Sequence, residues 1–175
     1  MIFGWALPTF FIGMSDKNME INLRPAQPED AEAVCDVHIA SIRILCAKDY
    51  TSEQIAAWVS NCTPENYRIA IEKMGETMFV ARKKEAIVGF SALFESEIRA
   101  IYVHPNYTRQ RVGTLLLEAL EREAVNRNIY NLKLSASINA KSFYESCGYQ
   151  VIEYSVHTLP SGVKIPCVDM EKSLV

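Results

Sequence analysis

Residues 100 to 117, AIYVHPNYTRQRVGTLLL, combine the groups of this chain that are best suited to holding a phosphate. A strand-like run ends at a proline turn, a short polar loop follows, and an apolar helical pattern begins at Val112. The first amides of a helix lack partners within it and carry partial positive charge, so they bind anions readily. Arg109 and Arg111 add charge that could face a polyphosphate. The alternative is an ordinary strand-to-helix connection with two solvated arginines.

Other residue types that commonly do chemistry show no such grouping. The five cysteines are odd in number and form no CxxC pair, and the three histidines are equally scattered. These patterns indicate reduced thiols in a cytoplasmic protein, with no metal site and no cysteine placed for nucleophilic catalysis.

The elements that must position these groups follow from hydrophobic periodicity. Helices are expected from the acidic turn near residue 28 to residue 45, after Ser52 as an N-cap, and over 64–74, 112–126 and 140–146. Gly148 suits a left-handed cap at the end of the last helix. The expected strands are 20–24, 77–82, 86–94, 98–103, 132–136, 151–156 and 164–171. This mixed order indicates an α/β or α+β sheet with helices on its faces.

Two motifs resemble the GNAT family of N-acetyltransferases. Residues 103–107, VHPNY, followed by a loop and the GTLLL run from Gly113, are similar to its acetyl-CoA signature. Residues 137–149, SINAKSFYESCGY, are similar to its NAxxFYExxGF motif, and the resemblance covers roughly Met19 to Leu174. It implies a mixed, mostly antiparallel sheet of six or seven strands flanked by about four helices, with strands four and five splayed.

The pyrophosphate loop departs from the family pattern, Arg/Gln-x-x-Gly-x-Gly/Ala. Thr108 replaces the usual Arg or Gln, Arg111 replaces a glycine, and only Gly113 is met. If position 111 needs a positive φ, arginine costs about 1–3 kcal/mol there. Any residue except proline still supplies a backbone amide. The resemblance therefore implies acetyl-CoA binding through Arg109, Gln110, Arg111, Val112, Gly113 and Thr114.

The same resemblance implies roles nearer the thioester. Asn139, with Ser142 in the same motif, would contact the pantetheine region, and Tyr144 would protonate the departing thiolate. A tyrosine of ordinary pKa about 10 can pass a proton to a thiolate whose acid lies near 8.5 to 9. Packing beside Phe143 is the alternative role of Tyr144. The pantetheine amides would bond to the backbone of the fourth strand, at Ile101, Tyr102 and Val103, with Ile101 and Val103 favoured.

The acceptor side is expected from less specific signals. Residues 49–58, DYTSEQIAAW, resemble a bacterial subgroup of the family, so Tyr50 and Trp58 are candidate substrate contacts, although a helical tryptophan is often core. Glu95 is the favoured general base, with Glu97 on the same side of the strand by alternation. A solvated surface glutamate, or His104 as the base, is the alternative.

Composition limits the classes of partner. A net charge of −3 and a pI of about 5.7 argue against nucleic acid. Residues 1–18 are expected to form an apolar extension, too short to cross a membrane, that is either dispensable or a tail for docking to a membrane or a partner, and residues 19–175 are expected to form one domain. We expect acetyl transfer from acetyl-CoA to a primary amine of a small molecule or peptide, by a chain that could form a homodimer. A non-catalytic acyl-CoA-binding module and a protein-interaction domain on the same scaffold are the alternatives.

Overall fold

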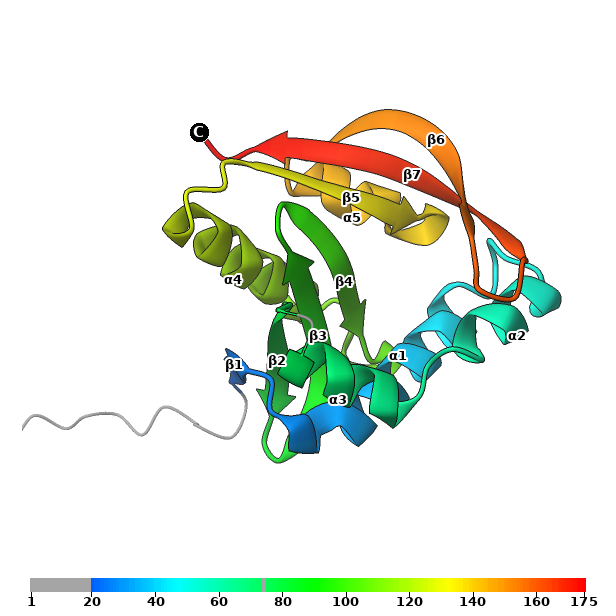
Figure 1. The fold of residues 1–175 in the computed structure, drawn as a ribbon, viewed down its shortest axis with the longest axis horizontal. Helices are drawn as coiled ribbons and strands as arrows, with labels where there is room; N and C mark the ends of the chain where they lie inside the picture. The colour runs from blue at the N-terminus through cyan, green and yellow to red at the C-terminus, as the bar shows by residue number, and fades with distance from the viewer. Residues whose placement is uncertain (1–19, 74) are drawn as a thin grey trace, which may run out of the picture.

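A computed structural model describes residues 20–73 and 75–175, so the apolar extension, residues 1–18, lies outside the described range (Figure 1). None of the described helices is long and apolar enough to cross a membrane. In chain order, the strands and α-helices of the described residues are β1 (Ile21–Pro25), α1 (Ala31–Leu45), α2 (Ser52–Val59), α3 (Pro64–Lys73), β2 (Thr77–Lys83), β3 (Ala86–Phe94), β4 (Glu97–Val103), α4 (Val112–Asn126), β5 (Asn131–Ser137), α5 (Lys141–Ser146), β6 (Gln150–Thr158) and β7 (Lys164–Ser173).

The mixed α/β class and the expected order of elements are confirmed. The described residues form five α-helices, the number that the periodicity predicts and one more than the resemblance implies, and α3 begins at Pro64. A residue before proline is disfavoured in the helical region, so a new helix begins there.

One seven-stranded sheet has the order β1-β2-β3-β4-β5-β7-β6. Only β4 and β5 are parallel, and they pair through two residue pairs, Glu97 with Lys133 and Ile98 with Leu134. Beyond Ile98, β5 separates from β4, and β5, β7 and β6 lie apart from strands β1 to β4 (Figure 1). The expected splay of strands four and five is confirmed.

Helices cover both faces of the β1–β4 half. Val34 and Val37 of α1 pack on one face, and Val112 and Leu116 of α4 pack on the other. Gly89 of β3 allows the close approach of α4, because a Cβ there would lie 2.9 Å from Cγ1 of Val112. A side chain at position 89 would push away the helix whose N-terminus carries the expected phosphate loop.

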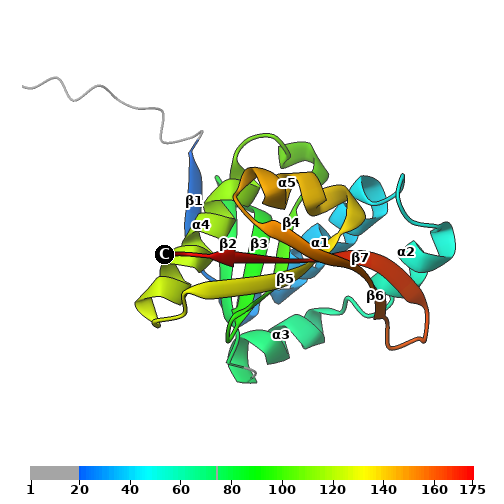
Figure 2. The ribbon, with the colours of Figure 1, turned by 90° about the horizontal axis from the view of Figure 1, so that it is seen from above.

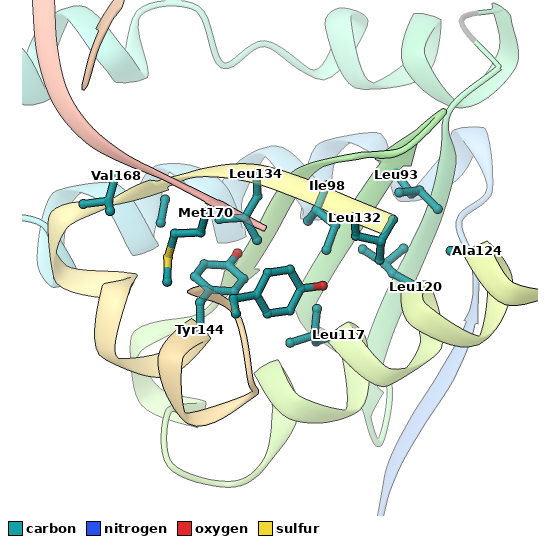
Figure 3. Close-up of a cluster of buried hydrophobic side chains, with 12 residues drawn as sticks. Leu93, Ile98, Leu117, Leu120, Ala124, Leu132, Leu134, Tyr144, Val168 and Met170 are labelled. Atoms are coloured by element: carbon teal, nitrogen blue, oxygen red, sulfur yellow. The ribbon is translucent and has the colours of Figure 1, made fainter. Parts of the chain in front are cut away.

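A cluster of apolar side chains joins strands β1 to β4 to strands β5, β7 and β6 where the two halves of the sheet begin to separate (Figure 3). It draws side chains from β3, β4, α4, β5, α5 and β7, so it replaces the missing strand pairing with packing. Its buried members are Leu93, Ile98, Leu117, Leu120, Ala124, Leu132, Leu134, Ala136, Tyr144, Tyr149, Val168 and Met170.

The N-cap of α2 is Thr51, and the expectation of Ser52 is wrong. The Thr51 hydroxyl accepts from the amide of Gln54 at 3.2 Å, and the Gln54 side chain accepts from the amide of Thr51 at 2.9 Å. This reciprocal capping box requires Gln or Glu three residues after the cap, which only Thr51 satisfies. Ser52 is the first helical residue instead.

A partly buried ion pair fixes the start of α1 against β1. Arg24 donates to both carboxylate oxygens of Asp30, at 2.6 and 2.8 Å, and the amide of Gln27 donates to Asp30 at 2.8 Å. The hydrogen bonds from Arg24 are the main cause that holds the pKa of Asp30 below its usual value.

Asp30→Asn should lower the free energy of unfolding at pH 7 by about 1–3 kcal/mol, because charged hydrogen bonds are lost. The pKa of Asp30 is lower in the folded than in the unfolded chain. Its stabilisation is therefore complete above the ordinary aspartate pKa of about 4 and is lost as the pH falls through the folded-state value. Urea unfolding at pH 7 and pH 3 should show the difference from wild type shrinking at pH 3. Exposed Glu29, as Glu29→Gln, is the control, and an equal difference at both pH values would contradict the ion-pair explanation.

Candidate functional site

The loop before α4 has a left-handed backbone at two arginines. The φ angles are 58° at Arg109 and 64° at Arg111, so the suspected positive φ at position 111 is present. Three contacts hold the loop in this shape. Lys83 donates to Oε1 of Gln110 at 2.8 Å, Nε2 of Gln110 donates to the Asn106 carbonyl at 3.2 Å, and the Thr108 hydroxyl donates to the Pro105 carbonyl at 3.0 Å.

Five consecutive backbone amides at this point are free to receive a ligand. Within the described residues, the amides of residues 110 to 114 donate to no protein group, and the first helical bond runs from Leu115 to the Arg111 carbonyl at 3.0 Å. Arg109, Gln110 and Arg111 are exposed. Unpaired amides, the positive end of α4 and two cationic side chains form a site suited to an anion such as a diphosphate.

Helix α5 packs beside this loop (Figure 2). A Cβ at Gly113 would lie 3.3 Å from Cζ of Phe143, so close packing, rather than the φ angle, favours the family-like glycine here. This contact places α5, which carries Tyr144, next to the first turn of α4.

The backbone of β4 offers an unpaired edge to the gap left by β5. The amide of His104 donates to the carbonyl of Val88 in β3 at 2.9 Å. Because backbone groups alternate between the two edges of a strand, those of Ile101 and Val103 face away from β3, toward the gap. Tyr102 has its backbone groups turned to β3, and its ring stacks on Phe90, so the geometry gives no support to cofactor contact by Tyr102.

Tyr144 lies in the cluster that fills the end of the gap (Figure 3). Its ring is 6% exposed, and burial raises its pKa well above the usual value for tyrosine. Within the described residues, no hydrogen bond of the Tyr144 hydroxyl is present, which leaves the phenol free to donate. Asn139 and Ser142 are exposed at the start of the same motif, and Oδ1 of Asn139 accepts from the Cys46 thiol at 3.4 Å.

Tyr50 anchors the segment between α1 and α2. Its buried hydroxyl donates to the Pro166 carbonyl at 2.8 Å and accepts from the Ile138 amide at 2.9 Å. The Trp58 ring packs against it with centroids 5.4 Å apart. Both residues therefore stabilise the segment between α1 and α2. Their direct contact with a substrate stays a prediction.

The three candidate general bases lie in a turn, at a surface hollow and directly after β4. Glu95 is exposed in the turn between β3 and β4, with φ of 51°, so the expectation that it starts the strand on the same side as Glu97 is wrong. A left-handed turn residue breaks the two-residue alternation of a strand. Glu97 lines a surface hollow with Lys133 and Asp169. Nδ1 of His104 accepts from the amide of Asn106 at 3.3 Å.

A cavity of about 200 Å³ against β4 contains residues that the sequence did not single out. His38, Tyr67, Glu76 and Arg99 line it, together with Ala100. They come from α1, α3, the segment before β2, and β4, so no local spacing in the sequence marks them as a group. Within the described residues, no group of three or more His, Cys, Asp or Glu side chains could hold a metal ion.

Comparison with known proteins identifies the family. A family model described as an acetyltransferase (GNAT) domain matches residues 46–174. The chain is 30% identical, over 134 residues, to the uncharacterized N-acetyltransferase YafP of Escherichia coli, a match that covers 76% of this chain and 83% of YafP.

Solved structures agree with this match. A GCN5-related N-acetyltransferase from Rhodopseudomonas palustris is 36% identical with a TM-score of 0.82, over 87% of this chain and 95% of that one. The PaiA N-acetyltransferase of Thermoplasma acidophilum, in complex with coenzyme A, shares the fold at 21% identity and a TM-score of 0.70, over 89% of this chain and 99% of that one. The chain therefore belongs to the GNAT acetyltransferase family.

Proposed function

We propose that this chain transfers an acetyl group from acetyl-CoA to the primary amine of a small molecule or peptide. The row of unpaired amides at residues 110 to 114, beside the open edge of β4, carries the proposal. Membership of the GNAT family supports it, as does the coenzyme A bound to the Thermoplasma acidophilum relative of the same fold.

In this proposal the amides of residues 110 to 114 bind the diphosphate, and Arg109 and Arg111 add electrostatic attraction. The backbone of Ile101 and Val103 bonds the pantetheine amides as a neighbouring strand would. Asn139 and Ser142 contact the same arm from the side of α5. Both reactants are thereby held in one place, and such positioning can contribute several kcal/mol to catalysis.

Bound acetyl-CoA supplies an activated thioester carbonyl. The open amides of β4 can polarise that carbonyl, and Tyr144 donates a proton to the departing sulfur. Burial keeps the Tyr144 phenol protonated at neutral pH. The same apolar surroundings also raise the pKa of the coenzyme A thiol. Proton transfer from the Tyr144 phenol to the thiolate therefore remains feasible. Glu95 as the general base stays a prediction, and its exposed turn position gives it no support.

Two measurements test the proposal. Calorimetry with coenzyme A should detect binding, and acetyl-CoA with a mixed amine library should release free thiol faster than acetyl-CoA alone. Binding without thiol release would reduce the function to that of an acyl-CoA-binding module. An absence of both heat and thermal shift with coenzyme A would contradict the proposal and leave an interaction domain.

Arg111→Gly should separate backbone strain from charge. Glycine adopts a φ of 64° without steric cost, so the free energy of unfolding should rise by about 1 kcal/mol. Loss of the guanidinium should weaken coenzyme A binding several-fold at low salt. Arg111→Ala is the matched control, because it removes the charge and keeps the strained Cβ. Equal stability of the two variants in thermal unfolding would show that position 111 is not strained.

Tyr144→Phe should lower kcat by about 100-fold, the scale of one positioned acid, with little change in the KM for acetyl-CoA. Tyr149→Phe is the control, since its buried ring packs against Tyr144 with centroids 5.7 Å apart and the change is chemically identical. Steady-state kinetics of both variants measure the effect. Unchanged turnover in Tyr144→Phe would remove Tyr144 as the acid.

A further inference from the structure

The 200 Å³ cavity lies over the part of β4 where pairing with β5 has ended. Ala92 of β3 and Ala100 of β4 stand opposite each other in the strand pairing, and both line the cavity. Their short side chains leave space that larger neighbours fill elsewhere on this face, where Phe90 stacks on Tyr102. Helix α1 contributes His38 to the cavity lining, and helix α3 contributes Tyr67.

Glu76 supplies a poorly satisfied negative charge at this cavity. Its side chain is 10% exposed, and within the described residues no hydrogen bond reaches its carboxylate. The nearest cation is Arg99, at 3.6 Å, which is beyond hydrogen-bond distance. The Arg99 guanidinium lies instead 4.8 Å over the Phe94 ring. A desolvated carboxylate with spare acceptor capacity is suited to a ligand that brings both positive charge and N–H donors.

The aromatic part of the cavity lining is uncharged at neutral pH. Nδ1 of His38 is hydrogen-bonded to the Tyr67 hydroxyl, and burial lowers the pKa of His38 to about 3. The imidazole therefore stays neutral and offers an aromatic surface, as do Tyr67 and Phe90. Among the described lining residues, Arg99 at the rim is the one fixed positive charge that competes for Glu76.

We propose that this cavity receives the acceptor as a compact primary amine with an apolar, ring-sized body, its ammonium beside Glu76. The inference rests on the proposed acetyl transfer. Size supports it, because 200 Å³ equals the liquid volume of about seven water molecules, at roughly 30 Å³ each. A small ring fits within that space.

The position next to β4 gives Glu76 a chemical role. Ala100 lines the cavity and directly precedes Ile101, whose backbone faces the gap where the thioester would lie. Glu76 takes a proton from the ammonium, and the freed lone pair forms the N–C bond as the C–S bond breaks. The sulfur keeps the bonding electrons and takes the Tyr144 proton. The nitrogen of the new amide gives its surplus proton through water to the Tyr144 phenolate, and Glu76 releases the proton that it took to the solvent. Burial raises the pKa of Glu76 above its usual value, which makes the carboxylate a stronger general base.

Three variants and one probe test the inference. The probe is benzylamine, assayed by thiol release from acetyl-CoA, with coenzyme A binding measured in parallel by calorimetry. Glu76→Gln should lower kcat/KM for benzylamine by about 100-fold or more and leave coenzyme A binding unchanged. Ala70→Leu fills the cavity from α3. It should raise the KM for benzylamine about tenfold, which is the size of effect expected when one apolar contact with the substrate is lost. Exposed Glu72→Gln on the same helix should match wild type.

The outcomes separate this inference from the function beneath it. Wild-type kinetics in Glu76→Gln, an unchanged KM in Ala70→Leu, or turnover of other amines but not of benzylamine would overturn the inference and leave acetyl transfer standing. A wild-type protein that neither binds coenzyme A nor releases thiol with any amine would overturn the proposed function itself.

Discussion

The end of pairing between β4 and β5 after Ile98 is the feature on which the remaining structure depends. Two residue pairs provide little stabilisation through backbone hydrogen bonds between β4 and β5. The two halves of the sheet are therefore joined mainly by the packed cluster that includes Leu117, Leu134 and Tyr144. The same separation leaves the backbone groups of Ile101 and Val103 without a strand partner. Because unpaired backbone groups are costly away from water, an extended ligand with amides of its own is stabilised there. Loss of sheet pairing thus leaves the open edge that the proposed binding site uses.

The position of α4 relative to that edge is set by two close contacts. Gly89 lets the helix lie against β3, and Gly113 lets Phe143 of α5 reach its first turn. The loop enters the helix through Arg111, whose φ of 64° lies in the left-handed region that is costly for residues other than glycine. The free amides and the Tyr144 phenol are consequently held on neighbouring elements by the core rather than by a flexible loop.

Much of this arrangement could be predicted from the sequence, and the failures have physical reasons. The helix Val112–Asn126 has the expected bounds because its apolar period and preceding loop agree. The cap at Thr51 was missed because its partner, Gln54, matters more than the identity of the cap alone. Glu95 was misplaced because its left-handed turn has no glycine to mark it. Glu76, His38 and Arg99 meet only through tertiary packing, so no local pattern predicts their cavity.

Amide hydrogen exchange, measured residue by residue by NMR with and without coenzyme A, tests the central claim most directly. If the backbone donors at the start of α4 grip the diphosphate, the amides of residues 110 to 114 should gain protection on binding, together with those of Ile101 and Val103 at the open edge of β4. Binding of coenzyme A that protects other amides and leaves these two groups unchanged would contradict the proposed site.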